Sequence, residues 1–316
     1  MVFKEKKSTL KEALQFVLLT KKLEKKSYWT IRDYRQRITE FINFLEEEYP
    51  DLEFVEEVSA DHLKHYIEQM DERNLSNTTV NGKLRYLKAF FNVAISEKLV
   101  DKEFENPMDG LTLRKESFNN SRHIAVPALD KLLDHTDKRT FLGMRNYMCM
   151  ILMLGTGIRP SEMLALDVDD CKDSHIIVRE EVSKSRELRI LPLATGAQRE
   201  MYKYLQIKGD WGGNILFPNY EGNRLSTRGL GEALKKIADE VGIDRNLIHT
   251  YAFRHTFAIN YLRRGGDLFK LQRLLGHTTL EMTRRYIRWD ISDLQSDFDE
   301  TSLAEEFIKS KKKRRR

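Results

Sequence analysis

The sequence predicts a mainly α-helical protein of the α+β class, with two domains and one small antiparallel sheet. The chain has 316 residues, which is too long for a single compact core of ordinary size. Apolar residues recur at helical spacing along most of its length. The period changes where two aliphatic runs, residues 175–182 and 188–193, flank a polar turn, and this pattern is typical of a hairpin.

Residues 1–108 carry helical patterns and are expected to form a bundle of four helices. In the second helix the apolar side chains fall on one face: Tyr34, Ile38, Phe41, Ile42 and Leu45. Ser59 can cap the third helix, and Ser76 or Asn77 the fourth. Pro107 ends the unit, because the residue before a proline is pushed out of helical geometry.

Residues 109–122 are polar and are expected to form an exposed linker. It is either a solvated hinge or a basic segment that follows a nucleic-acid backbone. Residues 123–316 are expected to form the second domain, with the hairpin and with helices over 126–135, 140–154, 197–207 and 226–241. Three further helices within 248–289 are joined by glycine turns, since glycine permits a left-handed helix cap. His277 is then expected at or beside a helix start, where backbone donors favour an anion.

The composition limits the partners and the compartment. Lys and Arg outnumber Asp and Glu by 54 to 49, and this modest excess alone does not indicate a nucleic-acid partner. Two cysteines, Cys149 and Cys171, cannot form a disulfide framework and are expected to stay reduced. The N-terminus has no pattern of a signal peptide, and the most apolar run, residues 147–154, is too short to span a bilayer. We therefore expect a cytoplasmic protein with no membrane partner.

Two glycine turns and the hairpin place basic side chains where they could bind a phosphate. Arg159 lies between two glycines that end one helix and a proline that starts the next, and its guanidinium can bind two phosphate oxygens at once. Glu162, one helical turn later, could orient it; alternatively the two form a surface ion pair. Lys184 in the hairpin turn could donate a proton to a leaving oxygen, or it is simply solvated.

The last three candidates lie within residues 248–289. Arg254 would be costly among apolar neighbours unless its charge met an anion. His277 could donate to a phosphate oxygen or cap a helix. Tyr286 follows two arginines, whose charge could stabilise a phenolate nucleophile, although a lone tyrosine on a helix usually packs in the core. Together these side chains suit attack on a phosphodiester.

No metal or cofactor is expected. The sequence contains no HExxH motif and no CxxC motif, and no histidine spacing brings three ligands together. The acidic run at Asp167, Asp169 and Asp170 could bind a divalent ion weakly, but a polar turn is the better interpretation.

At these residues the chain resembles the tyrosine recombinase (phage integrase) family over nearly its whole length. GTGIRPSEMLAL resembles the first family box, with Arg159 as the first catalytic arginine and Glu162 as the supporting acid. Lys184 matches the hairpin lysine, and Arg254 in YAFRHTFA matches the second arginine. LLGHTTLEMTRRY resembles the final box, with His277 as its histidine and Tyr286 as the nucleophile.

The chain departs from the family pattern at one position. The family usually has a histidine three residues before the second arginine, where this chain has Tyr251. A phenol can donate to a phosphate oxygen, but it cannot carry positive charge at neutral pH. The resemblance therefore still implies a role for Tyr251 at the phosphate, with weaker or less pH-sensitive activity.

The resemblance implies a SAM-like core-binding domain, a linker and a mostly helical catalytic domain. It implies a site-specific recombinase that cuts and rejoins DNA strands through a 3′-phosphotyrosyl intermediate, without ATP or a metal, in DNA integration, excision or resolution. Its partners would be double-stranded DNA with inverted half-sites and further copies of the chain, as a dimer on each site and a tetramer in the synapse. A C-terminal helix around residues 302–308, followed by a basic tail, would join the protomers. The alternatives are a type IB topoisomerase-like enzyme and a catalytically silent DNA-binding relative.

Overall fold

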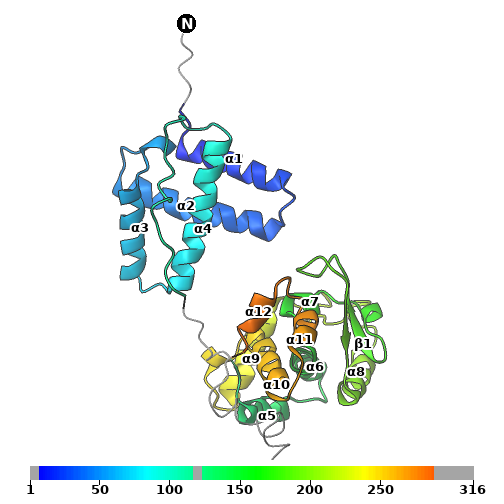
Figure 1. Ribbon diagram of the computed structural model, residues 1–316. Helices are drawn as coiled ribbons and strands as arrows, with labels where there is room; N and C mark the ends of the chain where they lie inside the picture. Colours follow the sequence, from blue (N-terminus) through cyan, green and yellow to red (C-terminus); the bar gives the residue numbers. More distant parts are fainter. Residues whose placement is uncertain (1–6, 117–122, 288–316) are drawn as a thin grey trace, which may run out of the picture. The chain divides into compact units, whose positions relative to one another are not determined.

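The computed structural model describes residues 7–116 and 123–287, and the chain divides into two compact units, residues 1–118 and 119–316 (Figure 1). The described residues are mostly helical, and their single sheet has two antiparallel strands. This confirms the predicted fold class. Each unit is described separately below.

The N-terminal unit contains four α-helices, as predicted. They are α1 (Leu10–Leu23), α2 (Tyr28–Glu48), α3 (Ala60–Glu72) and α4 (Asn77–Ser96), with a short 3-10 helix, η1 (Val55–Glu57), before α3. The Ser76 hydroxyl accepts a hydrogen bond from the backbone of Thr79 and caps α4, while Thr9 and Glu12 form a reciprocal capping box at α1. The core of this unit is rich in aromatic rings, including Phe41, which contacts both Tyr66 and Phe91 edge-on.

Two basic side chains of α4 form ion pairs within this unit. Lys83 is only 7% exposed and forms an ion pair of 2.7 Å with Glu40 on α2. Arg85, also on α4, pairs with Glu116 at 2.7 Å. Lys83 therefore helps to hold the bundle together and does not lie on its outer surface.

Residues 111–116 belong to the N-terminal unit, although most of their side chains are exposed. The buried Asn81 side chain donates to the carbonyl of Arg114 and accepts from its backbone N–H, at 2.8 and 2.9 Å. The Arg114 guanidinium in turn pairs with Asp71 on α3. The first part of the segment expected to be a linker is therefore fixed along α3 and α4.

The second unit is built on a long apolar helix. Its helices are α5 (Val126–His135), α6 (Phe141–Thr156), α7 (Pro160–Leu164), α8 (Thr195–Lys208), α9 (Thr227–Glu240), α10 (Thr250–Arg263), α11 (Leu268–Leu275) and α12 (Leu280–Arg284), with the 3-10 helices η3 (Val168–Asp170) and η4 (Arg245–Leu247). Helix α6 packs against α8 and α10 and is buried on nearly all sides. Gly157 ends it in the left-handed conformation, and a side chain there would overlap Phe257 and Leu275. This close packing brings the chain after α6 against α10 and α11.

The hairpin is shorter than the sequence predicts. Strands β1 (His175–Val178) and β2 (Arg189–Pro192) pair in register, with Val178 opposite Arg189. The strand stops at Arg179, whose guanidinium forms ion pairs with Asp167 and Asp170 at 2.8 and 3.0 Å. Its carbonyl accepts from the backbone of Ser183, so the chain turns there instead of extending the ladder. Asp167 and Asp170 of the acidic run thus pair with an arginine, and the run forms the polar turn that was expected.

Within the described ranges, no helix combines the length and apolar character needed to cross a membrane.

Candidate active site

Arg159 and Glu162 form a buried pair at the start of α7. Arg159 precedes Pro160 as the cap residue, and its Nη1 donates to Glu162 Oε1 at 2.8 Å. Arg159 is 7% exposed and Glu162 only 1%, so this is not a surface ion pair. Burial raises the pKa of Glu162, but the charges of Arg189 and Arg159 outweigh it and hold the pKa below its usual value. Glu162 is therefore a carboxylate that orients the arginine.

Arg254 meets Arg159 at the turn that follows α11. From α10, Arg254 donates to the carbonyls of Gly157 at 2.7 Å and Leu275 at 2.8 Å. Arg159 donates to the next carbonyl, that of Gly276, at 2.9 Å. Burial and the nearby Arg159 charge lower the pKa of Arg254 to about 10. Two guanidinium groups from distant parts of the sequence thus face one short turn, and we call them the arginine pair.

His277 occupies that turn and contacts the arginine pair directly. Its Nε2 accepts from Arg254 Nη2 at 3.0 Å, since a guanidinium only donates. Its Nδ1 therefore carries the proton and donates to Thr283 Oγ1 at 2.9 Å. Burial, followed by the charges of Arg254 and Arg159, lowers the pKa of His277 to about 3. The imidazole is neutral in the absence of an anion.

His277 lies beside the start of a helix, within the expectation, but its backbone donor is already used. Gly276 caps the end of α11 in the left-handed conformation, and α12 begins only at Leu280. The backbone N–H of His277 donates back to the carbonyl of Gln272, and the Gln272 amide donates to the carbonyl of His277. That N–H is consequently not available to an anion, and only the imidazole of His277 can contact one.

Tyr286 lies next to these cationic groups. Its ring stacks on His277 with centroids 6.3 Å apart and contacts His255 at 5.4 Å. Burial raises the pKa of Tyr286, while the Arg254 guanidinium opposes this through its charge and a hydrogen bond to the hydroxyl. Tyr286 also packs beside the small apolar cluster of Phe257, so core packing and proximity to the arginine pair occur together.

Lys184 and Tyr251 differ from the other candidates because both are exposed. The backbone N–H of Lys184 donates to Glu162 Oε1 at 3.1 Å, which ties the hairpin turn to the first arginine, while Lys184 itself is exposed. Tyr251 is 43% exposed, one helical turn before Arg254 on α10. The structure therefore brings together Arg159, Glu162, Arg254, His277 and Tyr286, with the Lys184 turn attached to them through Glu162.

Sequence reasoning missed two partners of this site. Arg189 on β2 is 9% exposed and donates to Glu162 Oε2 at 2.6 Å. The inward orientation of Arg189 could have been predicted, because side chains alternate along a strand and Leu191, two residues later, also points inward. Thr283 is fully buried and orients His277, but no local pattern identifies it.

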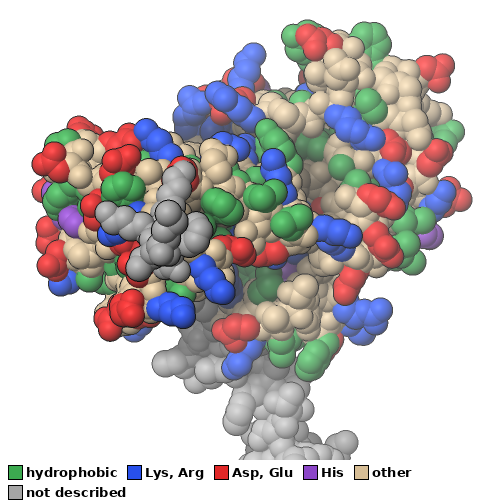
Figure 2. Space-filling model, turned by 90° about the horizontal axis from the view of Figure 1, so that it is seen from above, with side chains coloured by type: hydrophobic (Ala, Val, Ile, Leu, Met, Phe, Trp, Pro, Cys, Tyr) green, Lys and Arg blue, Asp and Glu red, His purple; other side chains and the backbone are tan. Residues whose placement is uncertain are grey.

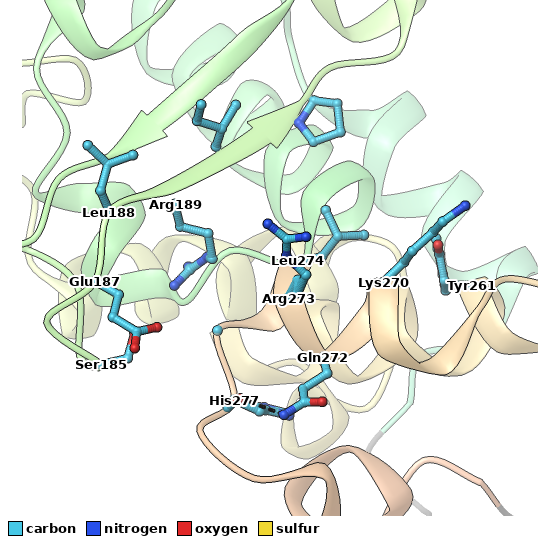
Figure 3. Close-up of a pocket in the computed structure, with 13 residues that line it drawn as sticks. Ser185, Glu187, Leu188, Arg189, Tyr261, Lys270, Gln272, Arg273, Leu274 and His277 are labelled. Atoms are coloured by element: carbon cyan, nitrogen blue, oxygen red, sulfur yellow. Dashed lines mark hydrogen bonds between the residues drawn. The ribbon is translucent and has the colours of Figure 1, made fainter.

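A groove of about 800 Å³ opens beside the site, between β2 and α11 (Figure 3). Arg189 and His277 line it together with Leu188, Lys270 and Arg273. Elsewhere, Figure 2 shows Lys and Arg interspersed with Asp and Glu over the face drawn, in keeping with a net charge of only +5. Within residues 7–116 and 123–287 we find no group of three or more His, Cys, Asp and Glu side chains placed to hold a metal ion.

Comparison with known proteins identifies the family. The model of the phage integrase family matches residues 124–292, and that of the phage integrase N-terminal SAM-like domain matches residues 18–98. The tyrosine recombinase XerC of Bacillus licheniformis is 30% identical over 274 residues, which cover 82% of this chain and 86% of that protein. XerC of Thermodesulfovibrio yellowstonii is 30% identical over 282 residues, covering 86% and 89%.

Solved structures share the fold. The Tn1549 transposon integrase in complex with transposon right end DNA superposes with a TM-score of 0.71 at 18% identity, covering 92% of this chain and 99% of that one. The XerH recombinase bound to its difH substrate gives a TM-score of 0.67 at 21% identity, covering 94% and 85%. Because the family model spans more than half of the chain and includes every residue of the site, this protein belongs to the phage integrase family of tyrosine recombinases.

Proposed function

We propose that this protein is a site-specific DNA recombinase that cuts and rejoins strands through a 3′-phosphotyrosyl intermediate. Membership in the family and the relatives named tyrosine recombinase support this activity. The observation that carries it is the convergence of Arg159 and Arg254 on consecutive carbonyls of one turn, beside the hydroxyl of Tyr286. Two buried cations beside one hydroxyl suit the binding of one phosphodiester.

In the proposed reaction, the Tyr286 oxygen attacks phosphorus and the bond to the 5′ oxygen breaks. Arg159, Arg254 and His277 bind the non-bridging oxygens as negative charge develops there. Each guanidinium has five N–H donors, so donors remain for the phosphate beyond those used on the backbone. The charge of Arg254 favours the phenolate form of Tyr286, against the effect of burial.

His277 must change its proton arrangement to act as a donor. In the structure its Nε2 accepts from Arg254, so a phosphate oxygen requires a proton on that nitrogen. The Thr283 hydroxyl can accept from Nδ1 or donate to it, and so it accommodates either tautomer. A bound phosphate would also favour the doubly protonated ring, because the anion offsets the neighbouring arginine charges.

Lys184 would protonate the departing 5′ oxygen, and Tyr251 would donate a hydrogen bond to the phosphate. The position of Lys184 supports this role, since Glu162 ties its turn directly to Arg159 while the long side chain stays free to reach the leaving group. Attack by the 5′ hydroxyl of a partner strand then reverses the chemistry. The phosphotyrosyl ester conserves the energy of the broken phosphodiester bond, so the proposed cycle consumes no ATP.

The partner we propose is double-stranded DNA with two inverted half-sites, bound by a dimer, with a tetramer in the synapse. By family resemblance a C-terminal helix around residues 302–308 joins the protomers; it lies outside the described residues. Deleting residues 301–316 should leave DNA binding intact and abolish synapsis, and normal tetramers of the truncated protein on DNA would exclude this role. We also propose that the protein acts in the cytoplasm, with Cys149 and Cys171 as free thiols.

A covalent capture experiment tests the function. The protein is incubated with a random-sequence duplex pool in EDTA, covalently bound strands are recovered under denaturing conditions, and the recovered sequence is built into a nicked suicide substrate. We expect an adduct on this substrate that Tyr286→Phe abolishes and that Tyr220→Phe, at an exposed tyrosine elsewhere, leaves unchanged. Retention of duplexes by the native protein without any covalently bound strand would indicate a silent DNA-binding protein, and relaxation of supercoils by a monomer would indicate a topoisomerase.

A further inference from the structure

Arg189 is a buried cation that the mechanism above does not use. It occupies an inward position of β2, opposite Val178, and is 9% exposed. Its Nη2 donates to Glu162 Oε2 at 2.6 Å. A charged side chain in such a place is costly unless it is paired, and here one carboxylate serves both Arg189 and Arg159.

Glu162 connects Arg189 to two groups of the proposed reaction. Its Oε1 accepts from the Arg159 guanidinium at 2.8 Å and from the Lys184 backbone N–H at 3.1 Å. Its Oε2 is held by Arg189. Since the carboxylate is planar and rigid, fixing one oxygen also fixes the other. The position of Arg189 therefore determines where both Arg159 and the Lys184 turn can lie.

Arg189 also packs against the turn that carries His277. A Cβ added at Gly276 would collide with Arg189 Nη1, so the guanidinium fills the space that a side chain at 276 would need. Arg189 Nε and Nη1 are buried and lack a hydrogen-bond partner among the described residues. Because unpaired buried donors are unfavourable, this arrangement costs stability and indicates a functional constraint on the position.

We propose that Arg189 is a positioning residue for the phosphate site: it sets Arg159 and the Lys184 turn through Glu162, and it supports the His277 turn through Gly276. It does not touch the phosphate itself. This inference rests on the proposed function. It assigns Arg189 two separable effects, one on the binding of the non-bridging oxygens and one on protonation of the leaving group.

Single-turnover adduct formation on the captured suicide substrate separates these effects. Each protein is assayed on the ordinary phosphodiester and on a 5′-bridging phosphorothiolate, whose thiolate leaving group needs no proton. We expect Arg189→Met to slow the phosphodiester reaction by about 10–100-fold. This is the typical effect of removing a residue that orients a functional side chain by a hydrogen bond, as known for the partners of metal ligands. The loss of rate on the phosphorothiolate should be several-fold smaller. Its leaving group needs no proton, so displacement of the Lys184 turn does not slow this reaction.

Two further variants keep the test independent of folding. Arg179 lies in the same hairpin but pairs with Asp167 and Asp170, not with Glu162. The Arg179→Met variant should therefore react at the wild-type rate on both substrates. Arg189→Lys keeps a charge for Glu162 but loses the planar contact below Gly276, and it should show an intermediate loss at a wild-type Tm. Rates are normalised to the folded fraction from thermal melts.

The outcomes distinguish this inference from the proposed function. If the wild-type protein forms no adduct that depends on Tyr286, the proposed function itself fails. If the wild type reacts but Arg189→Met and Arg189→Lys match the wild type, or lose no more than Arg179→Met, Arg189 is only structural. An equal loss of rate on both substrates would show that Arg189 does not act through the Lys184 turn, and this would overturn the proposal.

Discussion

The buried and exposed halves of the site are held in different ways. Arg159 and Arg254 are each less than a tenth exposed, and they are held by backbone carbonyls, by the Glu162 carboxylate and by the His277 imidazole. Lys184 and Tyr251 are exposed, and only the backbone of Lys184 is tied to Glu162. The arginine pair is therefore already in place in the protein alone, whereas in the proposed reaction Lys184 and Tyr251 take their final positions when DNA binds.

This difference separates effects on stability from effects on chemistry. A buried guanidinium that satisfies backbone carbonyls contributes to folding, so its loss should lower both Tm and rate. Loss of an exposed side chain should lower only the rate, because that side chain makes no contact that stabilises the fold. Each of the following predictions tests that separation, and they run from the largest effect to the smallest.

Tyr286→Phe should abolish the covalent adduct while leaving DNA affinity near the wild-type value. The ring remains in its place against His277 and His255, and only the attacking oxygen is lost. Denaturing gels measure the adduct, and a mobility shift measures binding. An adduct of normal yield in this variant would mean that another residue attacks.

Arg254→Lys should slow adduct formation by about 10³-fold and also lower the Tm. A lysine cannot reach both backbone carbonyls and the phosphate, and one lost donor to a developing oxyanion costs roughly 10²–10³ in rate. The matched control is Arg145→Lys, a buried arginine on α6 that donates to the Pro218 carbonyl. It should lower the Tm similarly while keeping the rate, and a similar loss of rate in both variants would contradict a specific role.

Lys184→Ala should slow the reaction by about 10²-fold without changing the Tm, as expected for loss of a general acid at an exposed position. The 5′-bridging phosphorothiolate should restore most of the rate. Lys172→Ala, at an exposed lysine just before β1, provides the control. A lowered Tm in Lys184→Ala would show that the side chain is part of the fold, against the comparison drawn above.

Tyr251→Phe should cost no more than about 5-fold in rate, which is the value of one neutral hydrogen bond. Tyr251→His restores the usual residue of the family and should increase the rate as the pH is lowered, since an imidazolium carries a charge that a phenol lacks. Tyr202→Phe is the control for an exposed tyrosine. Identical pH–rate profiles for the wild type and Tyr251→His would exclude contact with the phosphate.

The smallest effect concerns stability and pH. The pKa of His277 is lowered to about 3 in the folded protein, below its ordinary value of 6.5. Below pH 6.5 the unfolded chain takes up a proton that the folded protein does not, so stability is lost as the pH falls. Between pH 7 and about pH 5 the wild type should lose a few °C more in Tm than His277→Gln. His135→Gln, at an exposed histidine, should behave as the wild type.

The order of the helices follows from local signals in the sequence. Helical periodicity, capping residues and the glycines after α6 and α11 predicted the elements, because each depends on neighbours in the sequence. Resemblance then selected Arg159, Arg254, His277 and Tyr286. The exact extent of the hairpin was not predictable, since an ion pair between Arg179 and the acidic run ends the strand.

The sequence by itself determined the fold class, the family and the chemical types available at the site. Only the tertiary structure decided which side chains are buried together: Arg189 against Glu162, Thr283 against His277, and Lys83 against Glu40. The reason is physical. Periodicity is written in residues a few positions apart, whereas the charge state and orientation of a buried group depend on neighbours brought close by packing.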